Sequence, residues 1–238
     1  MSATAPAQLD HLVVAARTLE EGVAWCEATL GVTPGPGGEH VLFGTHNRLL
    51  RLHTPDAPRA YLEIIAINPA ATPTRADGLK RWFDLDDAAL QHTLAKQGPQ
   101  LVHWVASVPD LAAAHAALQD LGVERGPVLV ASRPTPHGLL QWQITVRDDG
   151  QRLMGGTLPT LIQWGDTHPA STLADSGLSL GAFTLRHPEP ERLRQALAAA
   201  GLAGITVEAG DAALHATLLT PRGTVLLGTS GETSPDIP

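Results

Sequence analysis

Hydrophobic and polar positions along the chain form a repeating pattern. Residues 9–32 (LDHLVVAARTLEEGVAWCEATLGV) begin with a short apolar run and continue with apolar residues at helical spacing. Residues 101–123 (LVHWVASVPDLAAAHAALQDLGV) repeat this arrangement. A histidine stands inside each apolar run, His11 in the first and His103 in the second, and a glycine closes each helical part. The pattern predicts a strand, a short turn and a helix in both segments.

Shorter runs typical of strands follow each of these segments. They are HVLFGTHNRLLRL and AYLEIIAI after the first, and PVLVAS, LLQWQITV and TLIQW after the second. A fainter third copy has LSLGAFTLRH as a strand, PERLRQALAAAGL as a helix, and ITVEA, ALHATLLT and TVLLG as strands. Each copy reads β-α-β-β-β, which predicts an α+β fold built from repeated modules.

The repeats and the segments between them suggest the domain organisation. We expect a first module at residues 8–69, a linker with a possible short helix at 70–99, and a second module at 100–166. A third, degenerate module is expected at 178–229, packed beside the other two as an accessory. Aligning Gly201 with Gly122 places Ala182 opposite His103, so the third copy keeps the architecture without the histidine.

Composition and charge narrow the classes of partner. The chain has 16 basic and 24 acidic residues and a formal net charge of −8, which argues against a nucleic-acid partner. No apolar run approaches the length of a membrane span, and the first residues lack a signal sequence. The single cysteine, Cys26, continues the apolar stripe of its helix and is expected to pack in the core. We expect a cytoplasmic protein that binds a small-molecule substrate, with neither a nucleic-acid nor a membrane partner.

Polar residues recur within the predicted strands. Glu63 lies in the middle of an otherwise apolar last strand of the first copy, where an unpaired carboxylate would be costly. Gln163 occupies a similar point in the last strand of the second copy. Two imidazoles, a carboxylate and an amide oxygen suit a divalent ion, so His11, Glu63, His103 and Gln163 could converge on Zn, Ni, Co, Mn or Fe.

The chain resembles the glyoxalase-like branch of the vicinal oxygen chelate superfamily. The resemblance covers about residues 8–166 and is carried by the two repeated segments, the pair GGEHVLFGTHNRLLRL and AYLEIIAI, and TLPTLIQWGD. It implies paired β-α-β-β-β modules and metal ligands from the first and last strand of each, which are His11, Glu63, His103 and Gln163 here. Gln163 departs from the commoner glutamate, which leaves Glu63 as the candidate catalytic base. The extra module leaves monomer and homodimer both open.

Four further residues are candidates for substrate binding. Tyr61 is two residues from Glu63 on one strand, so both should face the same cleft. Arg48 and Arg133 could hold a substrate carboxylate, since a guanidinium matches its shape. Trp142 could supply an apolar wall.

Several functions fit these residues. The first is a metal-dependent lyase or isomerase that chelates vicinal oxygens of a small carbonyl or hydroxy-acid compound, with Glu63 or a metal-bound water moving the proton. Two histidines and one carboxylate also form the facial triad of non-haem Fe(II) oxygenases. A metal-free protein that binds and sequesters a small molecule is the third possibility, so the sequence leaves enzymatic activity itself open.

Overall fold

The computed structural model describes residues 6–202 and 204–229. Its first elements are β1 (Gln8–Ala15), α1 (Leu19–Trp25) continued by the π-helical turn η1 (Cys26–Leu30), β2 (Glu39–His40), β3 (Thr45–His53) and β4 (Tyr61–Ile67). Next come α2 (Ala88–Gln97), β5 (Gln100–Ser107), α3 (Leu111–Asp120), β6 (Val128–Thr135), β7 (Gly138–Thr145), the 3₁₀ turn η2 (Met154–Gly156) and β8 (Thr160–Trp164). The last are the 3₁₀ turn η3 (Pro169–Ser171), β9 (Leu178–His187), α4 (Pro190–Ala199), β10 (Thr206–Ala209), β11 (Ala213–Thr220) and β12 (Gly223–Gly228).

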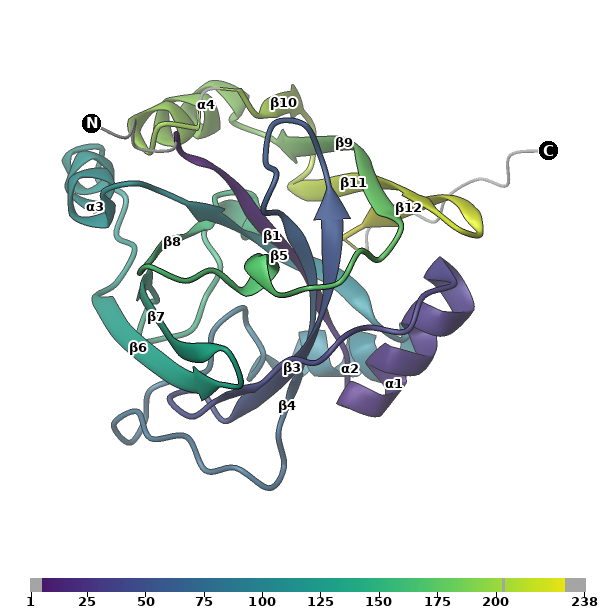
Figure 1. Cartoon of the computed structure of the whole chain (residues 1–238). Helices are drawn as coiled ribbons and strands as arrows, with labels where there is room; N and C mark the ends of the chain where they lie inside the picture. The colour runs from purple at the N-terminus through teal and green to yellow at the C-terminus, as the bar shows by residue number, and fades with distance from the viewer. Residues whose placement is uncertain (1–5, 203, 230–238) are drawn as a thin grey trace.

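The strands join into one large sheet with a few helices packed around it (Figure 1). The strand order is β12-β11-β9-β3-β4-β1-β5-β8-β7-β6, with β10 paired to β9 and β2 paired to β3. The predicted α+β fold class is confirmed. The division into modules at residues 8–69, 100–166 and 178–229 stays a prediction. No helix in the described part of the chain combines the length and apolar character of a membrane span.

Two similar halves of the sheet meet at β1 and β5. In each half the first strand runs parallel to the last, β1 with β4 and β5 with β8. β1 and β5 pair antiparallel, so a local pseudo-two-fold axis passes between them. The axis lies at the pair formed by Leu12 and Trp104, so it relates His11, which is opposite Val105, to His103, which is opposite Val13.

Capping residues determine where the first helix begins and ends. Thr18 caps its start by accepting a hydrogen bond from the backbone N–H of Glu21 at 3.2 Å. Gly31 ends it with a φ of 75°, a conformation that glycine adopts without penalty. Cys26 is buried against the sheet, and this burial raises the pKa of its thiol to about 12. The thiol therefore packs as an apolar group.

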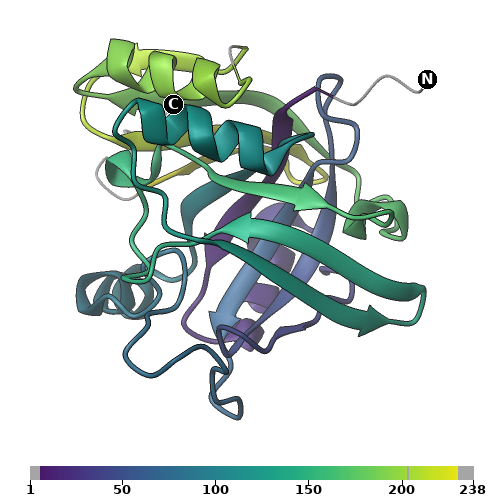
Figure 2. The same ribbon diagram turned by 90° about the vertical axis from the view of Figure 1, so that its left-hand side faces the viewer.

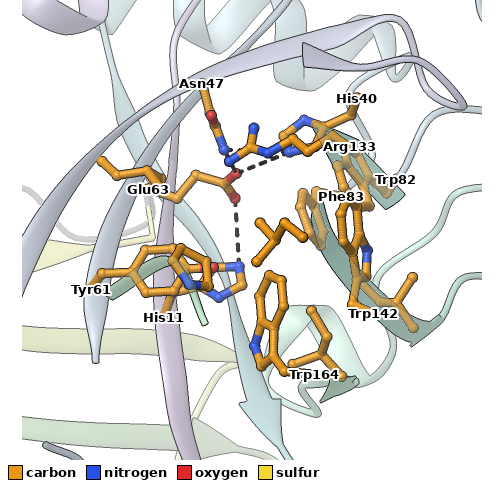
Figure 3. Close-up of a pocket in the computed structure, with 15 residues that line it drawn as sticks. His11, His40, Asn47, Tyr61, Glu63, Trp82, Phe83, Arg133, Trp142 and Trp164 are labelled. Carbon is orange, nitrogen blue, oxygen red and sulfur yellow. Dashed lines mark hydrogen bonds and ion pairs between the residues drawn. The ribbon is translucent and has the colours of Figure 1, made fainter. Parts of the chain in front are cut away.

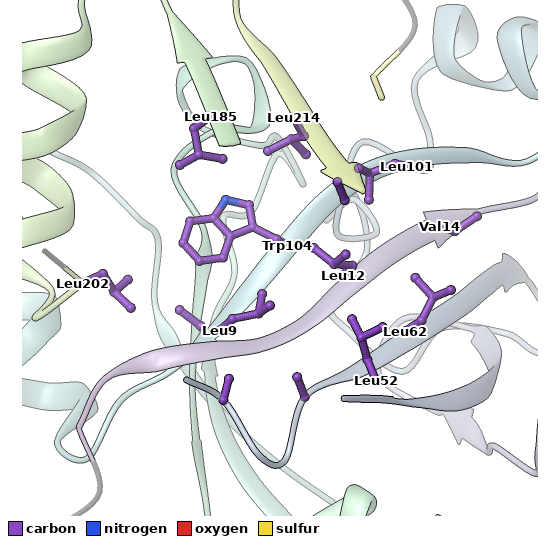
Figure 4. Close-up of a cluster of buried hydrophobic side chains, with 14 of the residues drawn as sticks. Leu9, Leu12, Val14, Leu52, Leu62, Leu101, Trp104, Leu185, Leu202 and Leu214 are labelled. Carbon is purple, nitrogen blue, oxygen red and sulfur yellow. The ribbon is translucent and has the colours of Figure 1, made fainter. Parts of the chain in front are cut away.

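The central strands are buried on both faces, which explains their nearly continuous apolar sequences. Even-numbered residues of β1 and β4, such as Leu12 and Leu62, enter the larger core together with side chains of β5, β9 and β11 (Figure 4). Odd-numbered residues such as Val13 and Ile65 face a second cluster, which Trp82, Phe83 and α2 help to cover. His11 and Glu63 belong to this odd-numbered face.

The last strands extend the sheet beyond β3. β9 pairs with β3 over a short parallel stretch, Leu52 with Leu178 and His53 with Ser179. Phe183 of β9 meets the buried Trp104 of β5 edge to face, with ring centroids 5.2 Å apart. Figure 2 shows α4 beside α3, and the two helices are in contact. The C-terminal strands thus share the core of the first two halves.

Candidate active site

A cavity opens on the odd-numbered face of the sheet, beneath the hairpin of β6 and β7 (Figure 3). It encloses about 410 Å³ of space, including its mouth. Polar side chains gather on one side of it and aromatic ones on the other. Its lining residues are His11, His40, Asn47, Leu49, Tyr61, Glu63, Trp82, Phe83, Arg133, Leu140, Trp142, Ile144, Ile162, Trp164 and Pro169.

Glu63 is held by a neighbouring amide. Asn47 Nδ2 on β3 donates to Glu63 Oε1 at 2.6 Å. The amide is itself oriented, because Asn47 Oδ1 accepts from the backbone N–H of Gly38 at 2.8 Å. Gly37 allows this approach, since a Cβ there would lie 2.0 Å from the Asn47 carbonyl oxygen. The glycine-rich turn thus fixes the carboxylate and leaves Oε2 toward His11.

His11 is held from its other side by a buried aspartate. Its Nδ1 donates to Asp10 Oδ1 at 2.7 Å, while its Nε2 lies 3.6 Å from Glu63 Oε2. Consecutive strand residues normally point to opposite faces, but Asp10 lies in a register irregularity of the β1–β5 pair. This local distortion accounts for two neighbouring side chains meeting.

Asp10 is a buried carboxylate that accepts hydrogen bonds from several side chains beneath the cavity. Its Oδ2 accepts from Trp164 Nε1 at 2.9 Å and from His168 Nε2 at 3.1 Å. Burial acts to raise the pKa of Asp10, but the hydrogen bonds from His11 and His168 outweigh it and bring this pKa well below its usual range. An ionised Asp10 keeps the proton of His11 on Nδ1 and directs Nε2 toward Glu63.

His40 adds a second imidazole to the polar side. Its Nε2 lies 3.9 Å from Glu63 Oε1, and its Nδ1 lies 3.0 Å from Thr45 Oγ1. Burial, helped by the charge of Arg133, lowers the pKa of His40 to about 3. His40 is therefore neutral at physiological pH and can exchange hydrogen bonds without adding charge.

His103 does not join His11 and Glu63. Its Nδ1 donates to the carbonyl oxygen of Gly156 at 3.0 Å, and its Nε2 accepts from the backbone N–H of Thr160 at 3.1 Å. Both ring nitrogens are thus engaged in the protein interior. The ring lines a different cavity and lies 5.3 Å from the ring of Phe83.

Gln163 and Arg48 also lie away from the cavity. Gln163 Oε1 accepts from the backbone N–H of Leu111 at 2.8 Å, at the start of α3. Its neighbours Ile162 and Trp164 line the cavity instead. Arg48 is exposed on β3, next to the buried Asn47 that does reach the site. The expected convergence of four ligands on one point is not observed.

The pseudo-symmetry relates His11 and Glu63 to His103 and Thr160. Val13 of β1 is paired in parallel with Glu63, and its counterpart Val105 of β5 is paired in parallel with Thr160. Thr160 Oγ1 lies 3.1 Å from His103 Nε2. The second half therefore has a hydroxyl group where the first half has the carboxylate of Glu63.

The second half does not offer the ligands that the family resemblance implies. Both ring nitrogens of His103 are engaged by backbone groups, and Gln163 contacts the start of α3. Among residues 6–202 and 204–229, no group of three or more His, Cys, Asp or Glu side chains is arranged to hold an ion. His11 and Glu63 instead face each other, with Nε2 and Oε2 3.6 Å apart.

The other sequence candidates do line the cavity. The ring of Tyr61 stacks on His11, with centroids 4.4 Å apart. Trp142 forms part of the aromatic wall. Arg133 reaches in from β6, and its Nε and Nη1 are buried without a hydrogen-bond partner among the described residues. A Cβ on Gly38 would collide with this guanidinium, so the glycine-rich turn also makes room for Arg133.

Sequence reasoning missed two groups that shape the site and ranked a third too low. Asp10 was missed because strand alternation predicts opposite faces for it and its neighbour His11. Asn47 lies on the same buried face of β3 as Thr45 and Leu49, and this two-residue period is a signal that could have identified it. His40 was only a weak ligand candidate, because it lies near a turn in a strand of two residues.

Comparison with known proteins agrees with the fold. The family model of the glyoxalase-like domain matches residues 9–201. The chain belongs to this family.

Solved structures similar to this glyoxalase-like protein include a hypothetical protein from Staphylococcus aureus, 15% identical, with a TM-score of 0.57, covering 93% of this chain and 85% of that one. Another is a Streptomyces coelicolor methylmalonyl-CoA epimerase variant in complex with 2-nitronate-propionyl-CoA, 20% identical, with a TM-score of 0.42 and coverage of 68% and 98%. The Mycobacterium tuberculosis methylmalonyl-CoA epimerase is 17% identical, with a TM-score of 0.39 and coverage of 72% and 95%. Comparison with curated proteins found no match.

Proposed function

We propose that this protein is an isomerase or lyase that moves a proton of a small carbonyl or hydroxy-acid compound. The pair formed by His11 and Glu63 carries this proposal. Their side chains are 3.6 Å apart at one wall of a cavity, and each is held from behind, by Asp10 and Asn47 respectively. General acid–base catalysis requires two such groups at fixed positions.

The pair can act as base and acid in one step. Glu63 takes the proton from the carbon next to a carbonyl, and the electron pair of the broken C–H bond moves toward the carbonyl oxygen. His11, protonated at Nε2, donates to that oxygen, while the ionised Asp10 stabilises its positive charge through Nδ1–H. Return of a proton to carbon gives the isomer, and departure of a group from the next carbon gives the lyase product.

The remaining lining residues indicate the class of substrate. Arg133 offers guanidinium donors that have no hydrogen-bond partner among residues 6–202 and 204–229, and these donors suit a carboxylate. Trp82, Phe83, Trp142 and Trp164 form an apolar wall on the other side. A small carbonyl compound with one carboxylate and a short apolar body matches this division.

Incorporation of solvent deuterium tests the proposal. A panel of α-keto acids, hydroxy ketones and 2-oxoaldehydes is incubated with the protein in D₂O and followed by ¹H NMR. We expect exchange at the carbon next to the carbonyl, reduced about 10²- to 10⁴-fold by Glu63→Gln. Arg48→Gln serves as the control because Arg48 is exposed outside the cavity.

The same panel distinguishes the rival functions. Equal exchange by the wild type and Glu63→Gln would refute the role of Glu63. Tight binding of a panel member without exchange would favour a sequestering protein. Consumption of O₂ with Fe(II) would favour an oxygenase.

A further inference from the structure

A second cavity shares a wall with the first. Trp82 and Phe83 line both. The second cavity encloses about 310 Å³ of space, including its mouth, and its other lining residues come mainly from the segment between β7 and β8. His103 lies here, as do three arginines, Arg125, Arg147 and Arg152. This concentration of positive charge is unrelated to the proton-transfer pair.

Arg125 is the unusual member of this group. It is only 5% exposed, its Nη2 donates to the carbonyl oxygen of Pro159, and its Nε lies 3.4 Å from Thr145 Oγ1. Its Nη1 is buried and has no hydrogen-bond partner among the described residues. No ion pair within residues 6–202 and 204–229 involves it. A buried cation without a counter-charge is costly, so the cavity is suited to an anion.

The neighbouring charged groups are already paired. Arg147 Nη2 lies 2.6 Å from Asp149 Oδ2, and Arg152 Nε lies 2.7 Å from Asp84 Oδ2. Burial and the charges of Arg152 and Arg125 hold the pKa of His103 well below its usual range, so this imidazole is neutral. The uncompensated charge of the cavity is therefore that of Arg125.

We propose that the second cavity binds a small oxyanion, a carboxylate or a phosphate, through Nη1 of Arg125. One guanidinium edge with a free donor matches the oxygens of either anion. The site lies apart from Arg133, so it goes beyond the proposed function and does not depend on it. The bound anion would stabilise the fold by balancing the buried charge.

Thermal unfolding measures this binding directly. The Arg133→Gln variant is used as the background, because it removes the free guanidinium of the first cavity. Its Tm is recorded against increasing sodium phosphate in one series and sodium acetate in another, at constant ionic strength. We expect at least one anion to raise the Tm by about 5–10 °C at a concentration a hundred times its Kd.

A second substitution locates the effect. Arg125→Gln in the same background should abolish the anion-dependent rise, whatever its own effect on the Tm. Arg17→Gln is the matched control, since Arg17 is exposed and pairs with Glu21. An equal rise in the Arg125→Gln variant, or no rise with either anion in the background variant, would overturn the proposal.

A crystallographic measurement covers the case in which Arg125→Gln does not fold. Crystals of the wild-type protein are soaked in selenate, an analogue of phosphate in shape and charge. Anomalous scattering from selenium beside Arg125 Nη1 is the expected result. A second cavity without a selenium peak at full soaking concentration would contradict the anion site.

Discussion

His11 and His103 occupy equivalent places on β1 and β5, since His11 lies opposite Val105 and His103 lies opposite Val13 in the antiparallel pair. Only the first histidine lies beside a carboxylate. His11 Nε2 is 3.6 Å from Glu63 Oε2, whereas His103 Nε2 is 3.1 Å from Thr160 Oγ1. The protein therefore has an imidazole and a carboxylate in one half and an imidazole and a hydroxyl group in the other.

Restoring the missing carboxylate should create a metal site. We expect Thr160→Glu to bind Co²⁺ or Zn²⁺ at least about tenfold more tightly than the wild type, because a carboxylate would then lie beside His103 as Glu63 lies beside His11. Co²⁺ absorption and calorimetric titration measure the binding. The larger side chain is expected to cost about 1–3 kcal/mol of stability without metal.

Gln163→Glu provides the matched control for the Thr160 substitution. Gln163 lies on the same strand but contacts the start of α3, so its carboxylate would not lie beside His103. An increase in metal affinity for Gln163→Glu equal to that of Thr160→Glu would show that the assignment of faces on β8 is wrong.

Asp10→Asn should impair both turnover and stability. The substitution removes the charge that orients His11 and accepts hydrogen bonds from Trp164 and His168. We expect kcat to fall at least about 10²-fold, since the tautomer of His11 is no longer fixed, and the free energy of unfolding to fall by about 3 kcal/mol. Steady-state kinetics and urea denaturation measure the two effects. A stability loss with unchanged kcat would reduce Asp10 to a structural residue.

More of the fold than of the candidate site could be predicted from the sequence. Periodicity revealed the strands and helices because the buried faces of β1, β4 and β5 repeat the same apolar pattern. The positions of the candidate ligands followed only in part. His103 is the counterpart of His11 in the strand pairing. Gln163 was chosen as the counterpart of Glu63, but Thr160 occupies that place, three residues away and on the other face of β8.

Other features of the site arise only in three dimensions. Asp10 contacts His11 because of a local register irregularity between β1 and β5. The alternation of apolar and polar residues does not predict this irregularity. Trp82 and Phe83 come from the segment before α2, which the sequence marks only as a linker, yet they form one wall of the cavity. Long-range packing decides such contacts.

Stability should decline as the pH falls from about 6.5 toward 3. Burial lowers the pKa of His40 to about 3 and that of His103 well below 6.5, so the unfolded chain binds protons in this range that the folded chain does not. Each histidine contributes a slope of up to about 1.4 kcal/mol per pH unit. His40→Gln should reduce the slope, whereas His92→Gln, at an exposed position on α2, should not. Denaturation curves between pH 3 and 8 measure this, and equal slopes in both variants would contradict it.

Two arginines provide a test of substrate binding. Arg133→Gln should raise KM at least about tenfold for substrates with a carboxylate, because it removes the guanidinium that reaches into the cavity. Arg48→Gln should leave KM unchanged. Equal KM values for wild type and Arg133→Gln would place the carboxylate elsewhere.

The rate of deuterium incorporation by chelator-treated protein tests the central claim most directly. The wild type is stripped of divalent ions, its metal content is verified, and exchange into the best panel substrate is followed by ¹H NMR before and after Zn²⁺, Ni²⁺, Co²⁺, Mn²⁺ or Fe²⁺ is added. The proposed mechanism assigns proton transfer to Glu63 and His11 without a metal ion, so we expect the stripped protein to retain its full rate. Loss of exchange on stripping, with recovery on addition of one of these ions, would contradict the assignment.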